Sequence, residues 1–406
     1  MQASLPEWMR KTPEDAIARS ILSACVHCGF CNATCPTYQL LGNELDGPRG
    51  RLYQIKTVLE GQPATAKIQQ HLDRCLTCRA CETACPSGVQ YGRLLDIGRA
   101  HVAKQVPRSW GQKITRKGLR MTLPFPTRWR WAYRTAQQIR PLLPRFLASK
   151  IKPAVKSASL QPSNHPRKML ILQGCVQSVI TPEINEAAAR VLDSLGISLV
   201  QAPEAGCCGA LSYHLDAQEE GLDFMRRNID AWWPYVENGV EAIVTTASGC
   251  GVMVKEYGQY LANDPDYAEK AAEISRLSRD ISEILTAEPP VTISNAGRKM
   301  KIAFQSPCTL QHGQKLAGVT ERLLRQMGFN LVPVADAHLC CGSAGTYSIF
   351  QPEISRKLRD RKLAALEKNN PDLIATANIG CQLHLQSAAK MPVIHWIQLL
   401  ANDLRN

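Results

Sequence analysis

From residue 166 onward, the chain alternates short apolar runs with stretches of helical periodicity. Apolar residues recur at three- and four-residue intervals over 184–195 and 316–327, and Gly196 and Gly328 end these two stretches. Strand–helix–strand alternation is typical of parallel sheets with helical crossovers, so this half predicts two Rossmann-like α/β units. The strands expected from the apolar runs are 169–172, 197–200, 242–245, 302–304, 331–334 and 373–375.

The first hundred residues lack this alternation and hold two dense groups of cysteines instead. Three cysteines within seven residues cannot all face one side of a strand or helix, so we expect tight loops with short helices between them. The whole chain is therefore predicted to be an α/β protein with an α-helical N-terminal module. The predicted parts are an N-terminal module (1–100), a basic linker containing Pro and Trp (101–165), a first repeat (166–290) and a second repeat (291–406).

Length and composition exclude several classes of protein. With 406 residues, 45% hydrophobic and 20% charged, the chain predicts two or three folded domains rather than a disordered polymer. No apolar run reaches the roughly 18 residues of a membrane-spanning helix, and the N-terminus lacks the apolar core of a secretory signal. The 16 cysteines of the chain are therefore expected to stay reduced and to serve metal or thiol chemistry.

The cysteines of the N-terminal module form the run C-x2-C-x2-C-x3-C-P twice, fifty residues apart. This run is typical of bacterial two-cluster ferredoxins, in which the fourth cysteine of each run ligates the other [4Fe–4S] cluster. We therefore expect Pro36 and Pro86 to direct the chain away from each cluster. The predicted ligands are Cys25, Cys28, Cys31 and Cys85 for cluster I, and Cys75, Cys78, Cys81 and Cys35 for cluster II.

Structural zinc is the alternative for these motifs, but four-cysteine zinc sites do not require the third cysteine or the proline. His27 and His71 flank the motifs and are expected to be packing or surface residues. The segment 46–51 predicts a turn leading into a helix, from which Arg49 and Arg51 are placed to tune a nearby cluster by their charge.

A looser pattern recurs in the two repeats. A cysteine precedes a Cys-Cys-Gly triplet by 32 residues in each, and a Gly-Cys pair follows further on. Because the loops at one end of parallel strands meet at one edge of the sheet, each set is expected to gather there. An iron–sulfur centre, thiol redox chemistry and simple packing of buried thiols all remain open. The two sets are Cys175, Cys207, Cys208 and Cys250, and Cys308, Cys340, Cys341 and Cys381.

The charge of the chain is concentrated in one segment. Residues 101–170 contain 16 Lys or Arg and no Asp or Glu, whereas the whole chain carries a net charge of +13. Interleaved Trp and apolar residues favour docking on an anionic membrane surface or an acidic partner over nucleic-acid binding, and a plain solvated linker remains open. The chain has neither a G-x-G-x-x-G fingerprint after a strand nor a P-loop, so no nucleotide or flavin is expected on it.

Taken together, these motifs resemble the iron–sulfur subunits of membrane-associated flavin dehydrogenases and heterodisulfide reductases, and most closely those of bacterial glycolate oxidases. The similarity covers essentially the whole chain. The segments that carry it are CVHCGFCNATCPTYQLLGNELDGPRGRLYQIK, HLDRCLTCRACETACPSGV, AGCCGALSYHL, TASGCG, PCTLQH and HLCCGSAGTY.

The resemblance implies a cytoplasmic subunit, peripherally attached to the inner face of the cytoplasmic membrane. An FAD-binding partner subunit would oxidise glycolate to glyoxylate, or oxidise D-lactate, and a further flavoprotein-like subunit would complete the complex. This chain would have no catalytic residue of its own and would pass electrons towards membrane quinone.

The chain departs from the heterodisulfide-reductase pattern where C-x-x-C is usual, because Met253 and His384 replace the last cysteine. His384 could substitute as a ligand. About eight iron atoms per chain would leave the repeats without clusters, and more would fill them. The alternatives are an iron–sulfur subunit for lactate or glycerol-3-phosphate oxidation, a disulfide reductase acting at the Cys-Cys-Gly sites, and a zinc-dependent nucleic-acid binder.

Overall fold

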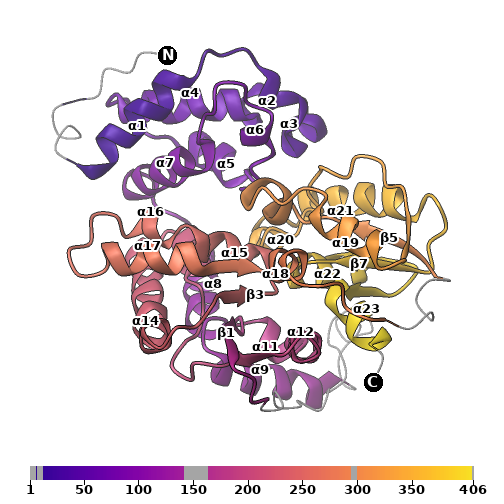
Figure 1. Ribbon diagram of the computed structural model, residues 1–406. Coiled ribbons are helices and arrows are strands. Elements are labelled where there is room, and N and C mark those ends of the chain that lie inside the picture. The colour runs from indigo at the N-terminus through magenta and orange to yellow at the C-terminus, as the bar shows by residue number, and fades with distance from the viewer. Residues whose placement is uncertain (1–5, 7–11, 141–162, 294–299, 405–406) are drawn as a thin grey trace.

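The computed structural model describes residues 6, 12–140, 163–293 and 300–404. It is a mixed α/β structure in which an all-helical N-terminal module packs against two α/β repeats (Figure 1). This arrangement confirms the predicted fold class. No helix in the described ranges is both long enough and apolar enough to cross a membrane.

The N-terminal module is a bundle of helices around one apolar core. The close approach of α4 and α7 depends on Gly98, where an added Cβ would lie 2.6 Å from Ile55 Cγ1. Leu22 and Leu94 are fully buried beside Ile55. The elements are α1 (Pro13–Ala24), α2 (Phe30–Ala33), α3 (Pro36–Leu41), η1 (Glu44–Asp46), α4 (Pro48–Leu59), α5 (Ala66–Asp73), α6 (Ala80–Thr83) and α7 (Tyr91–Gln105).

Each repeat contains one four-stranded parallel sheet, in the orders β2-β1-β3-β4 and β6-β5-β7-β8. The parallel strands predicted from the apolar runs are all present. Two further strands, β4 and β8, were not predicted, because each has only three residues and carries polar side chains. The strands are β1 (Arg167–Leu172), β2 (Ile197–Val200), β3 (Ile243–Thr245), β4 (Ser278–Asp280), β5 (Lys301–Gln305), β6 (Asn330–Val332), β7 (Leu373–Thr376) and β8 (Val393–His395).

Helices cover both sheets and connect their strands. In the second repeat the crossover helix begins at Val319 rather than at 316, because Gly318 has a φ of 74° and starts a new element. The first repeat has α11 (Gln177–Ile180), α12 (Glu183–Asp193), α13 (Ala210–His214), α14 (Gln218–Glu237), α15 (Ser248–Lys255), α16 (Tyr257–Tyr260), α17 (Ala268–Leu277) and α18 (Ile281–Ala287). The second has η4 (Thr309–Gly313), α19 (Val319–Gln326), α20 (Tyr347–Phe350), α21 (Pro352–Glu367), α22 (Ile379–Gln386) and α23 (Trp396–Asp403).

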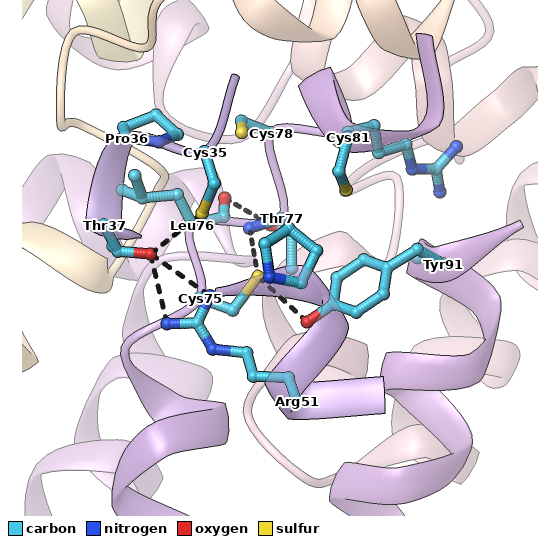
Figure 2. A pocket seen from close by; sticks show the side chains of 13 residues that line it. Cys35, Pro36, Thr37, Arg51, Cys75, Leu76, Thr77, Cys78, Cys81 and Tyr91 are labelled. Carbon is cyan, nitrogen blue, oxygen red and sulfur yellow. Dashed lines mark hydrogen bonds between the residues drawn. The ribbon is translucent and has the colours of Figure 1, made fainter. Parts of the chain in front are cut away.

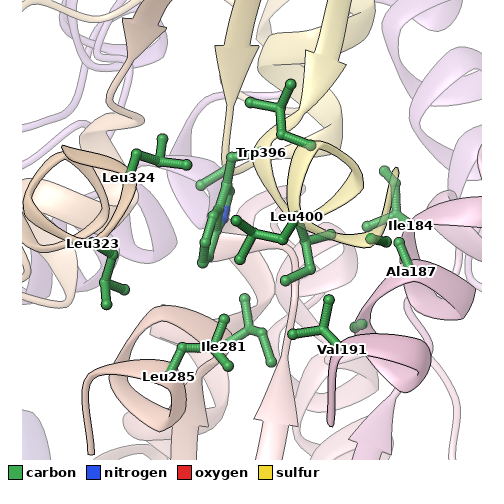
Figure 3. Packing of buried hydrophobic residues seen from close by; sticks show 14 of the residues in the cluster. Ile184, Ala187, Val191, Ile281, Leu285, Leu323, Leu324, Trp396 and Leu400 are labelled. Atoms are coloured by element: carbon green, nitrogen blue, oxygen red, sulfur yellow. The ribbon is translucent and has the colours of Figure 1, made fainter. Parts of the chain in front are cut away.

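One hydrophobic core spans both repeats. Helix α12 of the first repeat packs on α23 of the second, and α18 packs on α19. Figure 3 shows Val191 and Ile281 from the first repeat facing Trp396 and Leu400 from the second. Each of these four side chains is fully buried, so the two repeats share one folded core.

Two helices, α8 (Trp110–Thr122) and α9 (Pro126–Ile139), form the described part of the basic linker. Arg108 precedes them and pairs with Asp73 of the N-terminal module and with Asp216 of the first repeat, at 2.6 and 2.8 Å. Arg116 reaches the same Asp216 at 3.0 Å. The linker is thereby fixed to both neighbours, while its residues 141–162 lie outside the described ranges.

His395 also joins the repeats. Its Nε2–H donates to the Thr246 carbonyl at 2.8 Å, and its Nδ1 accepts the Ile397 amide at 3.3 Å, capping α23. The bond that Nδ1 accepts requires the neutral imidazole, whereas the bond that Nε2–H donates does not. Burial lowers the pKa of His395 from 6.5 to about 4, although the hydrogen bonds to backbone carbonyls oppose this shift.

We expect the folded chain to lose stability as the pH falls from 6.5 towards 4, because the unfolded state binds a proton there and folded His395 does not. The free energy of unfolding should fall by roughly 3 kcal/mol from this residue alone. Urea unfolding of wild type and His395→Asn at pH 7.5 and 5 should show roughly 2 kcal/mol of this loss in wild type, because pH 5 lies 1.5 units below the unfolded pKa of 6.5. The variant should show a smaller pH dependence, and an equal dependence in both proteins would contradict the assignment.

Candidate functional site

The two cysteine loops of the N-terminal module have matching backbone conformations. His27 and Thr77 occupy equivalent positions fifty residues apart and have φ values of 56° and 52°. Gly29 and Arg79 are the next equivalent pair, with φ values of 84° and 59°, and they cap α2 and α6. Left-handed residues reverse the chain direction repeatedly, so successive cysteines can face one centre. This is the tight loop that the cysteine spacing predicted.

The first loop surrounds a cavity lined by all four predicted cluster I cysteines. Cys28 is exposed, and the other three are half-buried. Burial, together with the Cys25, Cys28 and Cys85 thiols, raises the pKa of Cys31 to about 11. Cys85 therefore comes from the second loop to join the first loop's three cysteines.

The second loop surrounds a separate cavity lined by the four predicted cluster II cysteines, which Figure 2 shows with Arg51 and Tyr91. Cys35, Cys78 and Cys81 are buried. Burial and neighbouring thiols, among them Cys35, raise the pKa of Cys78 and Cys81 well above the usual value. Four crowded thiols in an apolar enclosure suit a thiolate-ligated cofactor, whose positive metal charge would offset the cost of ionising them.

The two cavities share a wall. Pro48, Cys81 and Tyr91 line both of them. Tyr91 is buried, and its hydroxyl lies 3.8 Å from Cys75 Sγ. The two centres are therefore separated by side chains rather than by solvent.

Among the described residues, no group of three or more His, Cys, Asp or Glu side chains is arranged to hold a metal ion. A single ion needs its ligands within bond length of one point, whereas an iron–sulfur cluster occupies a cavity between them. The thiol-lined cavities fit the second description.

A buried guanidinium group lies beside the cluster II cysteines. Arg51 is 1% exposed, and both of its terminal nitrogens donate to Thr37 Oγ1 at 3.1 Å. Its Nε donates to the His71 carbonyl at 2.7 Å, and its charge faces Asp46 at 3.6 Å. Burial opposes the charge of Arg51, but Cys75, Tyr91, Cys35 and Asp46 outweigh burial and raise its pKa.

Asp46 connects the rest of this network. Its carboxylate accepts from Arg74 at 3.0 Å and contacts His71 Nδ1 at 3.0 Å, so His71 is a packing partner, as expected. Thr37 Oγ1 lies 3.2 Å from Cys35 Sγ and donates to the Asp46 carbonyl. The predicted turn into a helix is confirmed, since Gly47 caps α4 and Pro48 begins it.

Arg49 occupies the corresponding position at the cluster I cavity. It donates to Glu44 at 2.7 Å and to the His27 carbonyl at 3.4 Å, and it also lines the cavity. Its side chain is partly exposed, unlike that of Arg51. Both arginines were predicted to lie near a cluster. In the structure, Arg49 lines the cluster I cavity and Arg51 lines the cluster II cavity.

The repeat cysteines also gather as predicted, beyond the ends of their strands. In the second repeat, Cys308 Sγ lies 3.8 Å from Cys340 Sγ, and Cys341 Sγ lies 3.3 Å from Cys381 Sγ. In the first repeat, the thiols of Cys175, Cys207, Cys208 and Cys250 are near enough to shift one another's pKa. The neighbouring Cys175 and Cys208 thiols lower the pKa of Cys207, whereas Cys208 and Cys175 have raised pKa values.

The two sets of repeat cysteines have different surroundings. Lys362 is buried near the second set, and its Nζ donates to the Asp336 and Ala337 carbonyls at 3.0 Å. Burial lowers the pKa of Lys362, although the four nearby thiols oppose this shift. In the first repeat, buried Asn228 donates to the Cys207 carbonyl, and the charge of Arg227 helps to lower the pKa of Cys207. His384 Nε2 lies 3.2 Å from Ser355 Oγ, and so is directed to a hydroxyl group.

The cluster II loop lies directly against the second-repeat cysteines, as the position of the module above both repeats suggests (Figure 1). The Cys308 thiol helps to raise the pKa of Cys78, and both residues belong to one buried cluster with Leu76 and Cys340. Nothing in the cysteine spacing indicated this contact.

Several side-chain contacts hold the module in this position, and three of them involve the cluster II loop and its neighbour Arg74. The Tyr347 hydroxyl donates to the Arg74 carbonyl at 3.1 Å. Thr83 Oγ1 lies 2.9 Å from His312 Nδ1. Arg79 forms a two-pronged ion pair with Glu256 of the first repeat. The cluster II loop thus contacts both repeats.

Comparison with known families matches both halves of the architecture. Residues 21–89 match the 4Fe-4S dicluster domain, and residues 169–255 and 302–386 match the cysteine-rich domain. The fold and the thiol sites therefore define an iron–sulfur protein that combines a dicluster module with two cysteine-rich domains. A crystal structure of a hypothetical protein from Helicobacter pylori shares the fold, with a TM-score of 0.57, 8% identity and coverage of 89% of this chain and 68% of that one.

Sequence relatives define the family more narrowly. The chain is 55% identical to the glycolate oxidase iron-sulfur subunit of Escherichia coli, over 100% of this chain and 99% of that protein. It is 30% identical to the probable glycolate oxidase iron-sulfur subunit of Bacillus subtilis, over 93% and 92% of the two chains. Lactate utilization protein A of Bacillus licheniformis is 26% identical and covers 54% of this chain and 90% of its own length. The chain belongs to the family of glycolate oxidase iron–sulfur subunits.

We expect Arg51→Met to make the midpoint potential of one cluster more negative, because it removes the buried positive charge beside Cys35 and Cys75. The variant should also lose about 3–5 kcal/mol of stability, because Asp46 loses a buried partner. Redox titration followed by electron paramagnetic resonance measures the potential.

Two further variants separate charge from structure. Arg51→Lys should leave the midpoint potential of the cluster close to the wild-type value, because it keeps the charge while losing the forked hydrogen bonds. Arg49→Met, at the partly exposed site, should change the midpoint potential less than Arg51→Met does. If the Arg51→Met protein loaded both clusters and showed unchanged potentials, the electrostatic role would be wrong.

Proposed function

We propose that the chain is the electron-transferring iron–sulfur subunit of a complex that oxidises glycolate, a 2-hydroxy acid. A separate FAD subunit would remove two electrons and two protons from glycolate, giving glyoxylate, and D-lactate would be a second substrate of the same subunit. This chain would carry the electrons onward to the membrane quinone pool. The observation that carries the proposal is the pair of four-thiol cavities with a shared wall, in a chain of this family.

Within this proposal, the cluster I and cluster II cysteines hold one [4Fe–4S] cluster each. Such clusters supply reversible one-electron storage when bound. The chain's own residues set the conditions for that chemistry. Tyr91 and Pro48 exclude water between the cavities. Arg51 places a fixed positive charge beside the buried cavity, which is that of cluster II. None of these residues acts on the substrate, so no catalytic residue is assigned to this chain.

The FAD subunit is proposed to approach the cluster I side of the module. Cys28 is the exposed cysteine of this set, and Val26 and Phe30, next to it on the loop, are 69% and 63% exposed. Apolar side chains around an exposed ligand suit a partner that must come close for electron transfer. A further flavoprotein-like subunit would complete the complex.

The repeat cysteines are proposed as additional iron–sulfur or redox sites. The second set is favoured over the first as the continuation of the electron path, because Cys78 of cluster II packs in one buried cluster with Cys308 and Cys340. The similarity to lactate utilization protein A supports lactate as an alternative substrate class for the complex.

The proposal is tested by mixing the anaerobically purified chain with its flavin subunit. Glycolate should bleach the iron–sulfur absorption only when both proteins are present, because substrate oxidation requires the flavin. L-lactate and glycerol 3-phosphate serve as matched substrates for the alternatives. Bleaching by glycolate without the flavin subunit, or no bleaching with it, would refute the division of labour.

A further inference from the structure

One side of helix α8 anchors it to the rest of the molecule. Arg116 pairs with Asp216 at 3.0 Å, and Arg120 faces Glu220 at 3.4 Å, both in the first repeat. The Arg116 guanidinium also stacks over the Phe350 ring of the second repeat, 4.9 Å from its centroid. These contacts fix which side of α8 faces solvent.

A second side of α8, about 120° around the helix axis from these arginines, is apolar and exposed. Trp110 is 79% exposed, and Ile114 and Met121 are more than half exposed. At about 100° per residue, these three side chains fall within about 40° of one another around the helix axis. They form one stripe along the length of the helix, which is the pattern of a helix whose outer side is covered by something apolar.

Positive charge accompanies this stripe. Exposed Lys117 lies about 20° from Trp110 around the helix axis, and exposed Lys113 lies about 60° from it, between the stripe and the anchored side. No acidic residue occurs between 101 and 170. The next helix, α9, adds exposed Arg130 and Arg134 on either side of Trp131, which is 70% exposed. We call the outward residues of the two helices the α8–α9 surface.

We propose that the α8–α9 surface docks the chain on an anionic lipid bilayer. The apolar stripe would enter the boundary between headgroups and acyl chains, with Trp110 at headgroup level, and the lysines and arginines would face lipid phosphates. A nucleic acid would use the charge but leave Ile114 and Met121 exposed to water. This inference is independent of the substrate, because lipid binding needs no flavin subunit.

Vesicle flotation tests the inference with the full-length chain purified anaerobically. We expect binding to phosphatidylcholine vesicles that contain phosphatidylglycerol, and little binding to pure phosphatidylcholine. The triple variant Trp110→Gln, Ile114→Gln, Met121→Gln should bind at least tenfold more weakly. The double variant Lys113→Gln, Lys117→Gln should lose roughly tenfold or more, since each basic residue near an anionic surface contributes about a factor of five. Glutamine preserves helix propensity, and all five positions are exposed, so folding should be retained.

Matched control variants distinguish this surface from general stickiness. Leu41→Gln, Tyr53→Gln, Ile349→Gln removes three exposed apolar side chains elsewhere, and Lys301→Gln, Lys390→Gln removes two exposed charges elsewhere. Both controls should bind as wild type does. The proposal is overturned if the chain binds no anionic vesicles, if it binds neutral vesicles equally well, or if the control variants weaken binding as much. The proposal would also be overturned if single-stranded RNA displaced the chain from vesicles and the triple variant bound that RNA as tightly as wild type does.

Discussion

The exchange of one cysteine between the two loops of the N-terminal module is the constraint on which the site depends. Cys85 lies with the three thiols of the first loop, and Cys35 lies with the three thiols of the second. Neither cavity can be completed by one loop, so both loops and the helices between them must fold together. The loops adopt this geometry at the cost of local backbone strain, because residues at equivalent positions of both loops have left-handed conformations. Shared wall residues then bring the two centres together.

Burial distinguishes the two centres. The cluster I cavity opens beside exposed Cys28, whereas three of the cluster II cysteines are buried, with Cys78 packed against the second repeat and Cys35 beside the network around Arg51 and Asp46. Burying a guanidinium group costs desolvation free energy. Here the ion pair with Asp46 and the hydrogen bonds to Thr37 and the His71 carbonyl offset that cost. One centre thus opens to the molecular surface and the other faces the interior, which suits a protein that carries electrons through itself.

The sequence predicted those features that follow from spacing and periodicity. Eight cysteines in two runs specified both cavities, and apolar runs specified six of the parallel strands. The strand Ser278–Asp280 was missed because all three of its residues are polar and form no apolar run. Lys362 was missed because a lysine is normally a surface residue, and its burial depends on carbonyl groups far away in the chain. The seating of Cys78 against Cys308 is a tertiary contact between parts that no local pattern connects.

Iron analysis of paired cysteine variants tests the exchange of cysteines most directly. Cys28→Ser with Cys85→Ser should lose about four iron atoms, no more than either single variant, because both residues belong to one [4Fe–4S] cluster. Cys28→Ser with Cys35→Ser should lose about eight, because each residue belongs to a different cluster. The reverse outcome, with the first pair losing both clusters and the second pair losing one, would show that each loop holds its own cluster and would contradict the account.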